Sequence, residues 1–216
     1  MPDGSSIEID IRIASSAWRA ALPNPAAAVR RAAIAALKAE LPARKKGAPK
    51  TGLSILLTDD AEMRKLNAGW RAKDKPTNVL SFPAENAVDP ARPPAYLGDV
   101  ALGLATCRRE AREQKKTLAD HVAHLTVHGV LHLLGYDHMD DEQAEAMEPL
   151  ETEILAGMGI ADPYRMAAPK PKAKAKKAAK KPAAKKKTVK KAAKTSVKKN
   201  AATRKSKPAA KRKSAR

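Results

Sequence analysis

The first 166 residues alternate between hydrophobic and polar positions in two periods, which predict strands and helices. Isoleucine occupies every second position from Ile7 to Ile13, with charged residues between, and this pattern is typical of a half-buried strand. Apolar residues three and four apart indicate a helix with one buried face. The sequence therefore predicts strands at 7–13, 53–57, 77–82 and 97–102, and helices at 26–41, 59–70, 106–115, 118–134 and 140–158.

These elements do not follow a strict strand–helix–strand alternation. The pattern predicts an α+β fold (mixed α/β), with a small central mixed sheet flanked by helices. A length of 166 residues suits one domain with a core of its own. We expect the histidine-bearing helix at 118–134 to be central in it.

The net charge of +20 is concentrated in the last 50 residues. Residues 167–216 carry 22 Lys and Arg and no Asp or Glu, whereas residues 1–166 carry 21 basic and 23 acidic residues. The segment 167–216 also has no Leu, Ile or aromatic residue to bury, which predicts a disordered basic tail. Such a tail is expected to bind nucleic acid, because binding releases counterions; a solubilising appendage is the alternative.

The single cysteine, Cys107, allows no intramolecular disulfide, and we expect it to be a small buried hydrophobic residue. No stretch reaches the ~18 consecutive apolar residues that a bilayer span needs. The start of the chain lacks the basic and apolar regions of a signal peptide. We expect a cytoplasmic protein with no membrane partner.

Histidine spacing provides the candidate chemistry, since all five histidines lie between positions 121 and 138. His128 and His132 are four residues apart and would share one face of the predicted helix. Gly135 tolerates the left-handed backbone that ends many helices, so the chain can turn back and bring His138 to the same point. Three imidazoles suit one zinc ion (Zn2+) with an open position, where a bound water has a pKa of roughly 7.

The two earlier histidines have weaker assignments. His124 lies one turn before His128 and is either a further ligand or a group that orients one. His121 is expected on the surface.

The stretch from His128 to His138 resembles the signature of the YbeY endoribonucleases, which bind zinc through three histidines. Two further blocks agree with that family in the same order, residues 66–71 leading into 75–83, and residues 97–100. The resemblance implies that His128, His132 and His138 are the metal ligands, and that Arg71 contacts RNA near the metal cleft. It also implies cleavage of single-stranded RNA, with roles in 3′-end maturation of small-subunit ribosomal RNA (16S rRNA) and in ribosome quality control. The tail departs from the family pattern.

The general base is left open by the sequence. Asp137 adjoins His138 and is a candidate base or orienting carboxylate. Capping the turn after Gly135 is an equally good interpretation of this residue. Asp99 has the same two interpretations, a base or orienting carboxylate on one hand and a structural role on the other. The attacking group is either water or a neighbouring 2′-hydroxyl. With 3% aromatic residues, RNA affinity should come mainly from phosphate contacts.

Two other functions compete with the endoribonuclease. A non-catalytic ribosome-assembly or nucleic-acid-binding factor would use the histidines for a structural metal, but structural zinc sites are usually closed by four ligands that include cysteine. A zinc protease of the His-Glu-x-x-His type would need a glutamate where this chain has Gly129.

Overall fold

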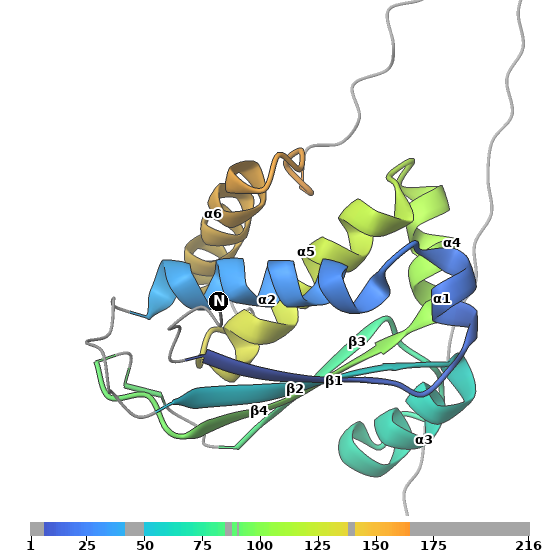
Figure 1. Ribbon diagram of the computed structural model, residues 1–216, viewed down its shortest axis with the longest axis horizontal. Coiled ribbons are helices and arrows are strands. Elements are labelled where there is room, and N and C mark those ends of the chain that lie inside the picture. Colours follow the sequence, from blue (N-terminus) through green and yellow to red (C-terminus); the bar gives the residue numbers. More distant parts are fainter. Residues whose placement is uncertain (1–6, 42–49, 85–87, 90, 138–140, 165–216) are drawn as a thin grey trace, which may run out of the picture. The chain divides into compact units, whose positions relative to one another are not determined.

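The computed structural model describes residues 7–41, 50–84, 88–89, 91–137 and 141–164, with only the backbone given for 141–144. It contains a four-stranded sheet of order β1-β2-β4-β3 (Figure 1). The strands are β1 (Ile7–Ile13), β2 (Thr51–Thr58), β3 (Val79–Pro83) and β4 (Tyr96–Gly103). β1, β2 and β4 run parallel and β3 pairs antiparallel with β4 at the edge, so the predicted mixed sheet is confirmed.

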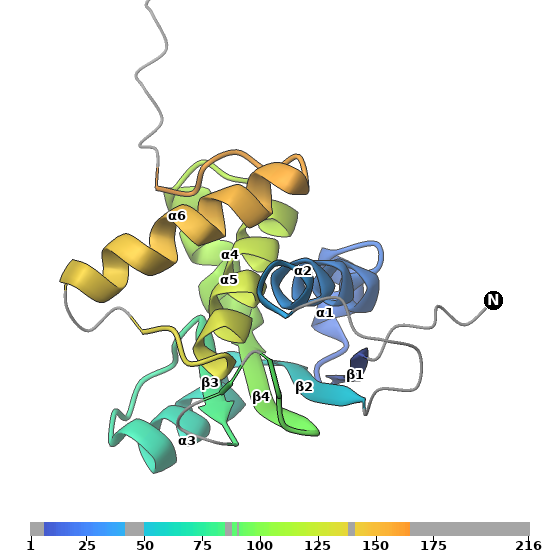
Figure 2. The same cartoon turned by 90° about the vertical axis from the view of Figure 1, so that its left-hand side faces the viewer.

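Helices cover both faces of this sheet. They are α1 (Ala17–Ala21), α2 (Pro25–Glu40), α3 (Asp60–Arg71), α4 (Leu104–Glu113), α5 (Leu118–Leu133) and α6 (Asp141–Gly157). α3 packs on one face, and α2, α4, α5 and α6 lie on the other, with α6 over α5 (Figure 2). The expected α+β fold with a central histidine helix is confirmed. Among the described residues, no helix is both long and apolar enough to cross a bilayer.

The alternation of side chains along the strands separates two parts of the core. On β4, Val100 and Leu102 belong to the main core under α2 and α5, whereas Ala101 packs with Met63 of α3 on the opposite face. Within the described part of the chain, β1 is an edge strand of the sheet, and Ile9 is its one buried residue, as expected for an edge strand with one covered face. Each face of the sheet therefore has its own apolar cluster, and the larger one contains α5.

The helix boundaries follow identifiable caps. The Asp59 carboxylate accepts from the Glu62 N–H at the start of α3, and the Thr117 hydroxyl accepts from the Asp120 N–H at the start of α5. The cap of α3 is thus Asp59. α1 was not predicted, because five residues are too few to display a helical period. The predicted tail at 167–216 lies outside the described residues and stays a prediction.

A paired imidazole site at the end of helix α5

The C-terminal half of α5 is held close to the sheet by a glycine. A Cβ atom at Gly129 would lie 2.8 Å from Val100 Cγ1 and 3.2 Å from Ser81 Oγ, so a side chain there would collide with β4 and β3. The Ser81 hydroxyl donates to the Gly129 carbonyl oxygen over 3.0 Å. The glutamate of a His-Glu-x-x-His motif does not fit at this position, because this side of the helix faces the sheet.

The helix ends as the sequence predicted. Gly135 has φ +96°, and the N–H groups of Gly135 and Tyr136 donate to the carbonyl oxygens of His132 and Leu131. This pair of bonds is the Schellman arrangement that a left-handed residue makes possible. The chain therefore turns sharply after α5 and places the Tyr136 carbonyl oxygen beside the last histidine of the helix.

His128 and His132 face one another across one helical turn. Their Nε2 atoms are 3.1 Å apart, and their ring planes are nearly perpendicular, at 85°. His128 Nδ1 lies 2.7 Å from Glu151 Oε1, and His132 Nδ1 lies 2.9 Å from the Tyr136 carbonyl oxygen. Both acceptors select the tautomer with a proton on Nδ1, which leaves a lone pair on each Nε2.

Two facing lone pairs repel each other unless a proton or a cation lies between them. Two nitrogen ligands at about 2.05 Å from a tetrahedral zinc ion are about 3.3 Å apart, close to the separation of the two Nε2 atoms. The second nitrogen of each ring is held by an oxygen, as is usual for metal-binding histidines. The His128–His132 pair therefore fits two positions of a zinc site.

Glu151 of α6 is the residue that sequence reasoning missed. It is fully buried, and its Oε2 lies 2.8 Å from His124 Nε2 and accepts from the Tyr164 hydroxyl over 2.5 Å. Burial by itself raises the pKa of this carboxyl, but hydrogen bonds from His124 and His128 outweigh burial and lower the pKa to about 2. The group is thus an ionised carboxylate that orients two imidazoles.

A signal for Glu151 did exist in the sequence. It falls four residues after Met147 and four before Leu155, both of which are buried. An acidic residue on the apolar face of an amphipathic helix requires a partner in the core. The same carboxylate helps to line a cavity of about 200 Å³ beside His128, together with Met147, Glu148 and Tyr164.

The earlier histidines do not behave alike. His124 contacts Glu151 and so supports His128 indirectly, which is one of its two expected roles. The expectation for His121 is wrong, because this side chain is only 2% exposed and its Nε2 lies 3.0 Å from Glu110 Oε2. Asn78 Nδ2 donates to the same Glu110 oxygen, so α4, α5 and the start of β3 are connected at this point.

The remaining candidates lie in different places. His138 lies outside the described residues, and within them no group of three His, Cys, Asp or Glu side chains is arranged to hold a metal. Asp137 is exposed in the turn after α5. Arg71 is the exposed last residue of α3, which packs on the sheet face opposite α5, and no hydrogen bond between described residues joins it to the imidazole pair.

Two other expectations have clear outcomes. Asp99 lies within β4, and its carboxylate accepts from the Tyr96 hydroxyl on the face away from α5. Cys107 is fully buried as expected, and burial raises the pKa of its thiol. Neither residue joins the imidazole site.

Comparison with known proteins identifies the relatives of this chain. Residues 18–159 match the family model described as Endoribonuclease YbeY. The chain is 54% identical over 163 residues to Endoribonuclease YbeY of Paramagnetospirillum magneticum, which covers 74% of this chain and 96% of that protein. It is 50% identical to the Azorhizobium caulinodans protein of the same name, and the match covers 75% of this chain and 99% of that protein. The fold is also similar to a solution structure of a Thermotoga maritima protein that is 24% identical in sequence. The match covers 70% of this chain and 91% of the Thermotoga chain, with a TM-score of 0.44.

Proposed function

Because this chain belongs to the YbeY endoribonuclease family, we propose that it is a zinc-dependent endoribonuclease that cleaves single-stranded RNA. Its role is in ribosomal RNA processing in the cytoplasm, including 3′-end maturation of small-subunit rRNA, and in ribosome quality control. The observation that carries the metal dependence is the pair of Nε2 atoms 3.1 Å apart, each on a ring whose Nδ1 is held by an oxygen.

The proposed zinc ligands are His128, His132 and His138. The first two are preorganised by Glu151 and by the Tyr136 carbonyl oxygen, which fix the rings before any metal arrives. His138 follows Gly135 by three residues, and the left-handed turn at Gly135 directs the chain back towards the helix end. Zinc held by three imidazoles supplies Lewis acidity and a water of lowered pKa.

Two further residues have proposed roles in handling the substrate. Arg71 is exposed, and its guanidinium can bind a phosphate through two parallel hydrogen bonds, which would hold an RNA strand that passes the edge of β3. Asp137 is exposed close after the helix end, where its carboxylate can accept a proton from the attacking group. Both roles come from the family resemblance or from position along the chain.

The experiment compares His132→Ala with His121→Gln in the full chain. His121 lies on the same helix but contacts Glu110, and glutamine retains a side-chain donor. Zinc content by elemental analysis and cleavage of a short single-stranded RNA should both be lost in His132→Ala and kept in His121→Gln. Equal cleavage by both variants would identify a contaminating nuclease and contradict the proposal.

The same experiment separates the competing function. If the parent protein binds zinc that His132→Ala loses, but cleaves no RNA, the chain is a ribosome-assembly or nucleic-acid-binding factor with a structural metal. Peptide hydrolysis is disfavoured, because position 129 has no room for a glutamate beside the imidazole pair.

The basic segment 167–216 is proposed to hold the enzyme on ribosomal RNA without selecting the cleavage site. Its 22 cationic residues give binding that depends steeply on salt and little on sequence. Deleting it should weaken RNA binding and flatten the dependence of affinity on salt, while zinc content stays unchanged. An unchanged salt slope would contradict this role.

A further inference from the structure

A second candidate site lies at the other end of the sheet from the imidazole pair. A cavity of about 640 Å³ is formed where the three parallel strands end. Its walls are Ser15 and Ala17 after β1, Asp59 after β2, and Leu104 and Ala105 after β4. Open sheets with parallel strands commonly bind ligands in a crevice at the carboxyl ends of those strands.

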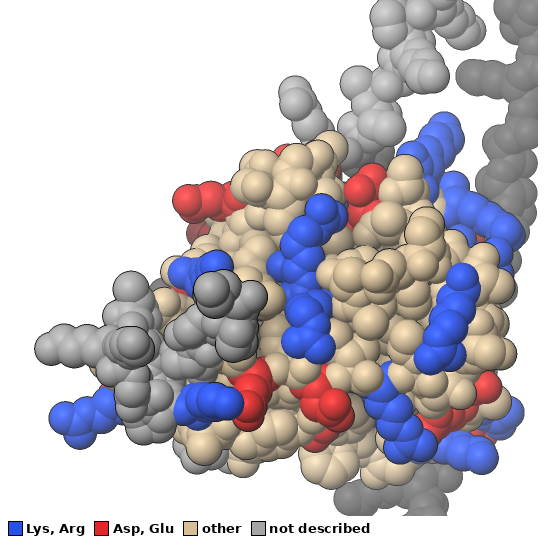
Figure 3. All heavy atoms as spheres, viewed as in Figure 1, with Lys and Arg blue, Asp and Glu red and all other residues tan. Residues whose placement is uncertain are grey.

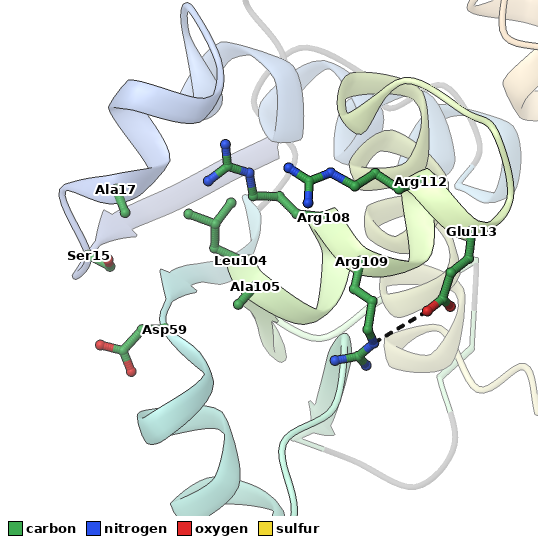
Figure 4. A pocket seen from close by; sticks show the side chains of 9 residues that line it. All are labelled: Ser15, Ala17, Asp59, Leu104, Ala105, Arg108, Arg109, Arg112 and Glu113. Carbon is green, nitrogen blue, oxygen red and sulfur yellow. Dashed lines mark ion pairs between the residues drawn. The ribbon is translucent and has the colours of Figure 1, made fainter.

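The fourth wall of this cavity is a row of arginines on α4. Arg108 and Arg112 are four residues apart, and their guanidinium groups extend in the same direction over the cavity towards α1 (Figure 4). Arg109 points away from them, to Glu113, with Nε 3.9 Å from Oε1. Lys and Arg side chains also gather on the α1 and α4 side of the face in Figure 3, with some acidic residues between them.

Three arginines and two carboxylates line this cavity, so its lining carries one net positive charge. Glu113 is paired with Arg109, and the Asp59 carboxylate accepts from the Glu62 N–H as the cap of α3. Among the described residues, the structure records no ion pair for Arg108 or Arg112. These two side chains are exposed and able to bind an anion.

The walls are joined so that the cavity has a defined shape. The buried Trp18 donates from Nε1 to the Thr58 carbonyl oxygen over 2.8 Å, which ties α1 to the end of β2. The Asp60 carboxylate accepts from both the N–H and the hydroxyl of Thr106, which ties the start of α3 to the first turn of α4. The arginines therefore project from a backbone that is held in place, and only their side chains have to be ordered on binding.

We propose that Arg108 and Arg112 bind phosphates of an RNA strand at this cavity, apart from the cleavage site. Two guanidinium groups on one helix face match neighbouring backbone phosphates, and the open cavity lets a long strand enter and leave. This inference rests on the proposed function for the choice of RNA as the anion. It predicts a strand that is held at the carboxyl ends of β1, β2 and β4 while another part of it is cut near α5.

The test uses the full-length protein and the double variant Arg108→Gln/Arg112→Gln. Its matched control is Arg30→Gln/Arg31→Gln, which removes the same charge from exposed positions of α2 outside the cavity. Affinity for a labelled 20-nucleotide single-stranded RNA is measured by fluorescence anisotropy at several salt concentrations, with EDTA present to prevent cleavage. Unchanged circular dichroism and, before EDTA is added, unchanged zinc content show that both variants are folded.

The cavity variant should bind the RNA about tenfold more weakly than the control variant. Its slope of log affinity against log salt should be smaller by about 1.4, since each lost single-strand phosphate contact contributes about 0.7. An equal loss in both variants would show general electrostatic attraction and overturn the proposal. So would an unchanged affinity in the cavity variant.

Two competitors identify the occupant. A mononucleotide or an acidic peptide of equal charge should displace the RNA from the parent protein only weakly. If the mononucleotide displaces the RNA as well as unlabelled RNA does, and the cavity variant loses this effect, the cavity binds a small phosphate ligand. If the acidic peptide does so, the cavity binds a protein. Either result would overturn the RNA assignment. Because binding is measured without cleavage, failure of the endoribonuclease activity would not change this result.

Discussion

The two ends of helix α5 use histidine in opposite ways. At the N-terminal end, His121 is only 2% exposed and directs Nε2 to the carboxylate of Glu110. At the C-terminal end, the His128 side chain is 21% exposed and directs Nδ1 to the carboxylate of Glu151, so that its Nε2 faces His132. Each histidine has a carboxylate partner, but it is held through Nε2 in His121 and through Nδ1 in His128.

The ring nitrogen used for the structural bond decides what a histidine can do. His121 uses Nε2 internally, and its Nδ1 is buried with no hydrogen-bond partner among the described residues. In His128 and His132 the Nδ1 atom is bonded to an oxygen, and the two Nε2 atoms face each other 3.1 Å apart. The N-terminal end is therefore a structural network, and the C-terminal end presents the imidazole pair for which we propose a zinc ion.

The largest expected effect separates the two ends directly. His128→Ala should reduce zinc affinity and RNA cleavage by more than about a hundredfold, because loss of an orienting partner alone reduces them about 10- to 100-fold. His121→Ala should keep both. Zinc affinity is measured by competition with a chelator, and a similar loss in the two variants would show that the ends do not differ.

Glu151→Gln tests the partner of the C-terminal end. The amide keeps the size of the side chain but removes the negative charge from His124 and His128, so zinc affinity should fall about 10- to 100-fold. Glu110→Gln makes the same chemical change at the N-terminal end and should leave zinc affinity within about twofold. If the two glutamine variants lose zinc equally, Glu151 acts only through stability.

The N-terminal end should matter for folding instead. His121→Ala leaves the half-buried Glu110 with Asn78 as its remaining partner, and should lower the free energy of unfolding by about 2–3 kcal/mol. Urea denaturation monitored by circular dichroism measures this change. A loss below about 0.5 kcal/mol would mean that the Glu110 network contributes little.

Lowering the pH should produce a smaller change, in the stability of the parent relative to Glu151→Gln. The pKa of Glu151 is lowered to about 2 in the folded protein, below its ordinary value near 4.5, so its contribution to stability is present above pH 4.5 and is lost as pH falls towards 2. Without zinc, the parent should lose on the order of 1–2 kcal/mol more than Glu151→Gln between pH 5 and pH 3. Parallel pH curves for the two proteins in urea denaturation would contradict the ionised state of Glu151.

Local patterns along the chain were enough to predict the secondary-structure elements and the candidate ligands. Alternation of isoleucines from Ile7 to Ile13 predicted β1, short and largely apolar runs predicted the other three strands, and the helical spacing of apolar residues predicted the five longer helices. Four-residue spacing placed His128 and His132 on one face, and Gly135 ended the helix as expected. These properties depend on residues that are close together in the chain, so the sequence pattern is enough to predict them.

The partner of each of these side chains, by contrast, depends on how the helices and strands pack together. Glu151 reaches His128 because α6 packs across α5, and His121 is buried because α4 brings Glu110 beside it. Strand order likewise gathers the ends of β1, β2 and β4 around the arginines of α4. Contacts between residues far apart in the chain are fixed by packing of the core, and no local period encodes them.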